Sequence, residues 1–152
     1  MPFINDILKY KSISFVGLEK NTGKTETLNY VLSRLCSFSN ITVGITSIGI
    51  DGEKTDQVTK TAKPEIIINP NTIFVTSQQL YPQKEIVSNI LSISNRSTAL
   101  GRLVFSQAIS SGKVLLAGAG NTIWLKEVID EIKSFGADIV LVDGALSRMS
   151  FG

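Results

Sequence analysis

Between residues 12 and 37, an apolar run is followed by a loop that contains Gly17 and Gly23 and then by an amphipathic pattern. Ser12–Val16 predicts a strand, and apolar residues at helical spacing predict a helix from about Lys24 to Ser37. Between them, the chain from Gly17 to Thr25 reads GLEKNTGKT. Glycines allow several backbone N–H groups to converge on one anion, and the start of a helix adds the positive end of its dipole. This order of elements predicts a loop that binds phosphate groups.

The loop also carries the side chains that such a site needs. Lys24 is placed to contact the β- and γ-phosphates of a nucleotide, and the Thr25 hydroxyl is placed to bind Mg²⁺. Five residues separate Gly17 from Gly23, whereas the commonest form of the motif has four. The alternative is an ordinary turn between a strand and a helix. The residues predicted to bind the nucleotide are Gly17, Glu19, Lys20, Asn21, Thr22, Gly23, Lys24, Thr25 and Glu26.

An acidic residue ends a second apolar run. Ile139–Val142 is wholly apolar, which is typical of a strand buried on both faces, and Asp143 follows it directly. Downstream of a phosphate-binding loop, an aspartate in this place is predicted to hold Mg²⁺ directly or through water. The alternative is an aspartate that only begins a turn.

Asp51, in the polar loop after the predicted strand Ile41–Ile48, could sit beside the phosphates or form a solvated Asp-Gly turn.

The middle of the chain consists of short apolar segments separated by turn residues. Turn chemistry at 69–71 (Asn-Pro-Asn) and at 110–112 (Ser-Ser-Gly) predicts that hairpins join these segments, and Gln78–Gln83 is compatible with a helical turn. The strands predicted here are Glu65–Ile68, Thr72–Thr76, Ile86–Ile93, Leu103–Ile109 and Lys113–Ala117.

The last third returns to alternating strands and helices. A helix is predicted over Thr122–Phe135, with Asn121 or Thr122 as its N-cap and Gly136 after its end. The preceding Gly118–Asn121 is interpreted as a turn in preference to a ligand site. Together the patterns predict one α/β domain over residues 1–152, with three layers, a mostly parallel central sheet and a β-hairpin-rich insertion at about 64–111.

Composition excludes several classes of function. The 152 residues are 43% hydrophobic and 18% charged, as expected of a globular chain, and no apolar run is long enough to span a bilayer. The net charge of +2, without a dense basic cluster, does not favour nucleic acid. No histidine is present to act as a general base or zinc ligand. The single cysteine, Cys36, is predicted to be a core residue and fits a reducing, cytoplasmic setting.

Several segments together resemble known nucleotide-binding proteins. The long loop is similar to that of dethiobiotin synthetase and of the cobyrinate and cobyric acid synthases, in the SIMIBI class of P-loop NTPases. The segments VGLEKNTGKTETLNY, ITSIGIDGE, VLLAGAGN and FGADIVLVDGALSR resemble the P-loop subunit of the reactivating factor for adenosylcobalamin-dependent lysine 5,6-aminomutase.

That resemblance implies an Mg²⁺-dependent ATPase that releases damaged cobalamin from an inactivated mutase. The implied partner is the aminomutase or a second reactivase subunit. Catalysis would involve Lys24 and Asp51, and the metal would be held by Thr25, Asp51 and Asp143. Lys20 lies one position from the signature lysine that in related ATPases reaches the nucleotide across a dimer, so a homodimer is a further alternative.

Two other functions remain open, and both use the same loop. One is an ATP-dependent small-molecule ligase of the dethiobiotin synthetase type, and the other is a nucleotide-sensing module without turnover. No Asn/Thr-Lys-x-Asp motif for guanine is present, so ATP is expected in preference to GTP. The sequence ends nine residues after Asp143, whereas P-loop domains continue further. The part that holds the base is therefore predicted to be missing, replaced or supplied by another chain, as in a fragment of a longer protein.

Overall fold

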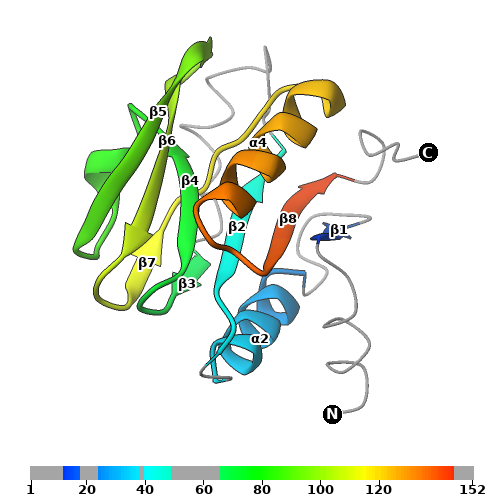
Figure 1. Cartoon of the computed structure of the whole chain (residues 1–152), viewed down its shortest axis with the longest axis vertical. Helices are drawn as coiled ribbons and strands as arrows, with labels where there is room; N and C mark the ends of the chain where they lie inside the picture. Colours follow the sequence, from blue (N-terminus) through cyan, green and yellow to red (C-terminus); the bar gives the residue numbers. More distant parts are fainter. Residues whose placement is uncertain (1–11, 18–23, 38–39, 49–65, 146–152) are drawn as a thin grey trace.

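The computed structural model describes residues 12–17, 24–37, 40–48 and 66–145, and it combines helices with a mixed sheet (Figure 1). Within these residues six strands form one sheet in the order β1-β8-β2-β4-β6-β5, and β3 pairs with β7 in a second sheet. The strands are β1 (Ser12–Gly17), β2 (Val43–Ser47), β3 (Ile66–Ile68), β4 (Ile73–Ser77), β5 (Ser88–Thr98), β6 (Gly101–Ala108), β7 (Gly112–Val114) and β8 (Ile139–Ala145). The helices are α2 (Lys24–Cys36), the 3-10 helix η1 (Tyr81–Gln83) and α4 (Thr122–Ser134). The predicted α/β class is confirmed.

One half of the large sheet is parallel, and helices cover both of its faces. Strands β1, β8, β2 and β4 pair in parallel. Along β8, Leu141 belongs to the core cluster that contains α2, whereas its neighbours Val140 and Val142 belong to the cluster that contains α4. Because successive residues of a strand point to opposite faces, α2 and α4 lie on opposite faces of β8. A strand covered in this way must be apolar throughout, as the predicted strand Ile139–Val142 is.

The other half of the sheet is antiparallel, which corrects two of the predicted hairpins. Strand β4 pairs with β6, and β6 pairs with β5. A turn is present at 69–71, where the Thr72 N–H donates to the Asn69 carbonyl at 3.2 Å and Asn71 has a positive φ of 75°, and the chain bends at residues 109–110. However, the strands on either side of each turn do not pair with each other, because β3 pairs with β7. The hairpin of this region is β5–β6, which turns at Ala99 and Leu100. Three of the strands predicted for the insertion, now β4, β5 and β6, thus belong to the large sheet.

The helices α2 and α4 begin and end within one residue of their predicted bounds. Leu28, Leu32 and Leu35 of α2 are completely buried, as are Leu125 and Ile132 of α4. The half-buried Cys36 packs against the α2-side cluster, consistent with its predicted core role. The predicted helical turn near residue 80 is the 3-10 helix η1.

Gly44 lets α4 pack directly on β2. A Cβ atom built at Gly44 would overlap the Cγ2 methyl of Ile132 and lie 3.3 Å from the Cβ atom of Ala137. A side chain there would force the helix away from the sheet, so the packing distance between the two elements depends on this glycine.

We therefore expect Gly44→Ala to lower the free energy of unfolding by about 1–3 kcal/mol, because overpacking displaces α4. Urea unfolding measures this loss. Ile132→Leu removes the Cγ2 methyl that the new Cβ atom would meet, so the double variant should lose less stability than the sum of the two single variants. Additive losses would contradict this explanation.

Candidate functional site

The carboxyl ends of β1, β8 and β2 lie side by side at one edge of the sheet. In the parallel register Asp143 of β8 stands between Phe15 of β1 and Ser47 of β2, and Gly17 stands beside Ala145. In parallel α/β sheets, ligands bind outside the carboxyl ends of the strands. The last predicted strand therefore extends through Asp143 and brings this aspartate beside the end of β1, the strand that precedes the predicted phosphate-binding loop.

Asp143 points to the face of the sheet that carries α2. It follows Leu141 by two residues, and Leu141 packs in the α2-side cluster. Its neighbour Gly144 faces the other side, where a Cβ atom would overlap the side chain of Ile48. The Oδ1 oxygen of Asp143 is shielded from solvent, whereas the residue as a whole is partly exposed. A carboxylate with one shielded oxygen at a strand end is a suitable ligand for Mg²⁺.

Helix α2 begins at the same edge. Because β1 and β2 are parallel, the helix that joins them must start near the carboxyl ends of the strands and return to their amino ends. Its first three residues are Lys24, Thr25 and Glu26, whose side chains lie outside the described part. Glu19, Lys20, Asn21, Thr22 and Gly23 lie outside the described residues, as does Asp51. The structure thus brings Gly17, the start of α2 and Asp143 to one edge.

A segment of irregular chain separates β2 from β4 near this edge. The two strands pair directly only at Gly44 and Ile45 of β2. Beyond that point Ala117 lies between them, accepting a hydrogen bond from the Ser47 N–H (3.3 Å) and donating its own N–H to the Val75 carbonyl (3.0 Å). We call Leu115–Gly118 the inserted segment.

Two buried threonine hydroxyls hold the inserted segment from opposite sides. Thr46 of β2 donates to the Ala117 carbonyl at 3.0 Å, and Thr76 of β4 donates to the Leu115 carbonyl at 2.8 Å. At Gly118 a Cβ atom would overlap the carbonyl oxygen of Ser47, so only glycine allows this approach. Close packing against β2 therefore accounts for Gly118.

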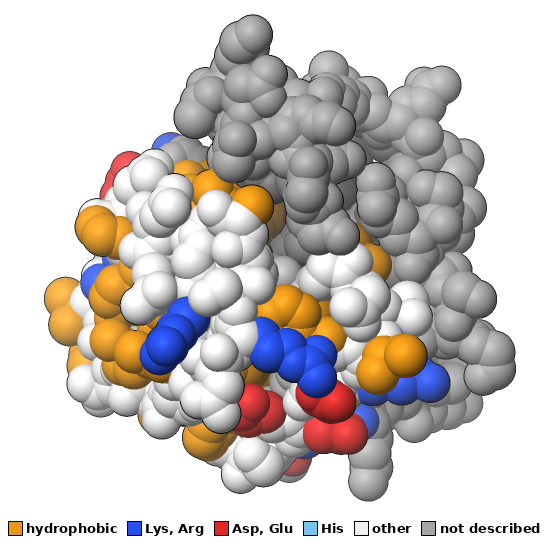
Figure 2. Space-filling view, turned by 90° about the horizontal axis from the view of Figure 1, so that it is seen from above, with side chains coloured by type: hydrophobic (Ala, Val, Ile, Leu, Met, Phe, Trp, Pro, Cys, Tyr) orange, Lys and Arg blue, Asp and Glu red, His pale blue; other side chains and the backbone are white. Residues whose placement is uncertain are grey.

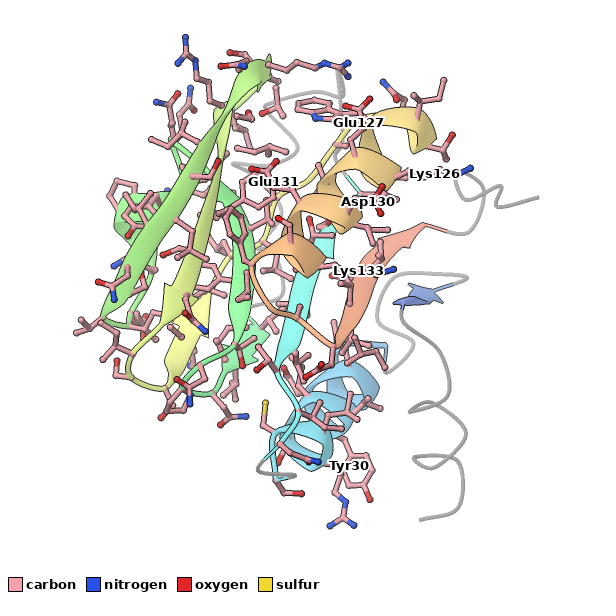
Figure 3. The ribbon with its side chains drawn as sticks, in the orientation of Figure 1. Tyr30, Lys126, Glu127, Asp130, Glu131 and Lys133 are labelled. Atoms are coloured by element: carbon pink, nitrogen blue, oxygen red, sulfur yellow. The ribbon has the colours of Figure 1, made fainter. Side chains whose placement is uncertain are left out.

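The inserted segment leads directly into α4, whose first turns contact the β5–β6 hairpin. Asn121 caps the helix, its Oδ1 accepting the Trp124 N–H at 2.8 Å, as predicted. The Arg96 guanidinium of β5 lies 5.4 Å from the centre of the Trp124 ring and 3.7 Å from the Glu127 carboxylate. Figure 3 shows Glu127 and Glu131 on the side of α4 that faces β5. The register of β5 is irregular between Ile93 and Ser97, and such a bulge redirects side chains such as Arg96.

Three hydroxyl-bearing residues of this edge were missed in the prediction from sequence. Ser47 lies beside Asp143 and donates its hydroxyl to the Ile48 carbonyl at 3.1 Å. Thr46 and Thr76 have exposed fractions of 0% and 1%. The one available signal was that these polar residues stood at or near the ends of two predicted strands.

Described charged side chains of both signs lie close together on the side of the molecule that Figure 2 shows. Basic and acidic groups adjoin one another there, with no broad basic area among the described residues. Within the described ranges, no group of three His, Cys, Asp or Glu residues could by itself hold a metal ion. A metal here would therefore need ligands from a nucleotide or from residues outside those ranges.

No helix in the described part is long and apolar enough to cross a membrane.

Comparison of the chain with protein-family models, with curated proteins and with solved structures found no match.

We expect Asn121→Ala to destabilise the protein by about 1 kcal/mol, because the Trp124 N–H would lose its capping partner. Asn121→Ser, which keeps a capping oxygen, should retain most of the stability. Thermal unfolding of both variants measures the difference. Equal stability of the two variants would show that the cap contributes nothing.

Proposed function

We propose that this chain is a P-loop nucleotide-binding protein that hydrolyses ATP with Mg²⁺. The observation that carries the proposal is the position of Asp143 on the strand next to the phosphate-loop strand, on the face covered by the helix that begins with Lys24. The strand order β1-β8-β2 and the helices on opposite faces support a three-layer, P-loop type of domain.

Each group at the edge has a distinct role in this proposal. The first N–H groups of α2 bind phosphate oxygens, and the Lys24 ammonium neutralises charge on the β- and γ-phosphates. The Thr25 hydroxyl and the Asp143 carboxylate would hold Mg²⁺, and Asp51 would orient the attacking water or complete the metal site. When bound, Mg²⁺ would neutralise the charge that develops on the phosphate oxygens. The protein's contribution is positioning and electrostatic stabilisation.

The biological setting that we propose is reactivation of a cobalamin-dependent aminomutase. It is supported by the four sequence segments that resemble the reactivase subunit, of which VLLAGAGN contains the inserted segment. ATP binding and hydrolysis would then drive a conformational step in the partner enzyme in a reducing, cytoplasmic compartment. Acceleration of ATP turnover by purified aminomutase would support this setting.

The direct test of the proposed function is calorimetric titration of the purified chain with ATP, GTP and a non-hydrolysable ATP analogue, each with and without Mg²⁺. We expect ATP to bind more tightly than GTP and Mg²⁺ to strengthen the binding. Absence of binding by all three nucleotides would overturn the proposal for this chain.

Lys24→Ala should weaken Mg-ATP binding at least about 30-fold, because the removed ammonium would leave phosphate charge uncompensated. Lys126→Ala is the matched control, since Lys126 is exposed on α4 and lies on the side away from β5 (Figure 3). Unfolding curves should show that both variants remain folded. Unchanged affinity in folded Lys24→Ala would contradict the role of the loop.

Asp143→Asn should weaken nucleotide binding about 10–100-fold in Mg²⁺ while changing it little in EDTA, because the lost charge matters only to the metal. The measurement is the ratio of the dissociation constants with and without Mg²⁺. An equal loss in both conditions would indicate a structural role for Asp143 and none in metal binding.

A further inference from the structure

We infer that the inserted segment is a mechanical link between two parts of the molecule. It transmits a displacement of the sheet edge where β1, β8 and β2 end, the proposed nucleotide site, to α4 and the β5–β6 hairpin. This inference rests on the proposed function, since it takes Mg-ATP as the ligand that alters the edge. It adds to that function a route by which nucleotide binding would alter the surface formed by α4 and the β5–β6 hairpin.

The first step of the route is the contact between β2 and the inserted segment. Ser47, which stands beside Asp143, donates its N–H to Ala117, and its carbonyl oxygen occupies the space that a side chain at position 118 would need. The next residue, Ile48, donates its N–H to the Asp143 carbonyl at 2.9 Å. The end of β2 is thus held between Asp143 and the inserted segment, and it has no room to move toward Gly118 without displacing it.

The second step is the attachment of the inserted segment to β4. The Ala117 N–H and the Leu115 carbonyl both bond to β4, the first to the backbone of Val75 and the second to the hydroxyl of Thr76. The strands β2 and β4 can therefore change their separation near this edge only if the inserted segment moves with them.

The third step is the connection to the hairpin. Three residues after Gly118, Asn121 caps α4, and the first turns of that helix contact Arg96 through the Trp124 ring and the Glu127 carboxylate. One turn further on, Glu131 accepts a hydrogen bond from the Ser92 hydroxyl of β5 at 2.8 Å. A displacement of Gly118 would consequently alter the surroundings of the Trp124 ring.

The arrangement provides its own reporter, because Trp124 is the one tryptophan in the chain. We expect Mg-ATP, or its non-hydrolysable analogue, to change the emission of Trp124 with the same midpoint concentration as calorimetric binding. The variant that tests the link is Thr46→Val/Thr76→Val, which removes both hydroxyl bonds to the inserted segment but keeps the shape of the side chains.

The matched control is Thr72→Val. Thr72 is as buried as Thr76, with an exposed fraction of 1%, and its hydroxyl hydrogen-bonds with Cys36 Sγ at 3.5 Å instead of with the inserted segment. Calorimetry on the same samples measures nucleotide binding independently of the fluorescence. We expect the double variant to bind Mg-ATP but to show an emission change at least about twofold smaller than that of the control, because the link is loosened.

Each outcome decides between the two proposals. Binding without any emission change in the natural chain would overturn the link and leave the proposed function standing. A full emission change in the folded double variant would also overturn the link. Absence of binding in the natural chain would overturn the proposed function and the link together. If the double variant does not fold, Thr76→Val alone takes its place, with a smaller emission change than Thr72→Val as the expected result.

Discussion

The placement of β8 between β1 and β2 is the constraint on which the remaining architecture depends. This strand pairs in parallel on both of its edges and is covered by α2 on one face and by α4 on the other. Each of the two helices therefore packs against β8, and the sheet positions of β1 and β2 are set by their pairing with it. The side chain at its carboxyl end, Asp143, consequently occupies a defined place in the candidate site.

Features that depend on local pattern could be predicted from the sequence. The spacing of apolar residues in α2 and α4 predicted both helices, because helical spacing of buried residues is a property of one continuous segment. The uninterrupted apolar run that begins at Ile139 likewise indicated a strand buried on both faces. Of the candidate site, the same local patterns were enough to propose Gly17, Lys24 and Asp143, each of which stands next to a predicted strand or begins a predicted helix.

Features that depend on the choice of a distant partner could not be predicted. The turn at 69–71 reverses the chain as its residues require, but pairing of the following strand is decided by β2 and β6, which lie far away in sequence. The predicted strand Lys113–Ala117 divides in the structure, since only its first part pairs in β7 and the rest enters the space between β2 and β4. A glycine at 118 permits that insertion and hydroxyls at 46 and 76 hold it in place, a combination that no single stretch of sequence displays.

The parallel pairing of β1 with β8 also has a consequence for how the chain acquires its structure. Ser12 pairs with Val140, so this pairing closes a loop that contains most of the chain, whereas the β5–β6 hairpin closes around two residues. Closing a long loop costs more chain entropy and is slower than forming local contacts. The hairpin can therefore form early, and the edge that holds Gly17 beside Ala145 is assembled late. The candidate phosphate site would then exist only in molecules that have completed folding, so nucleotide would select them from partly folded ones.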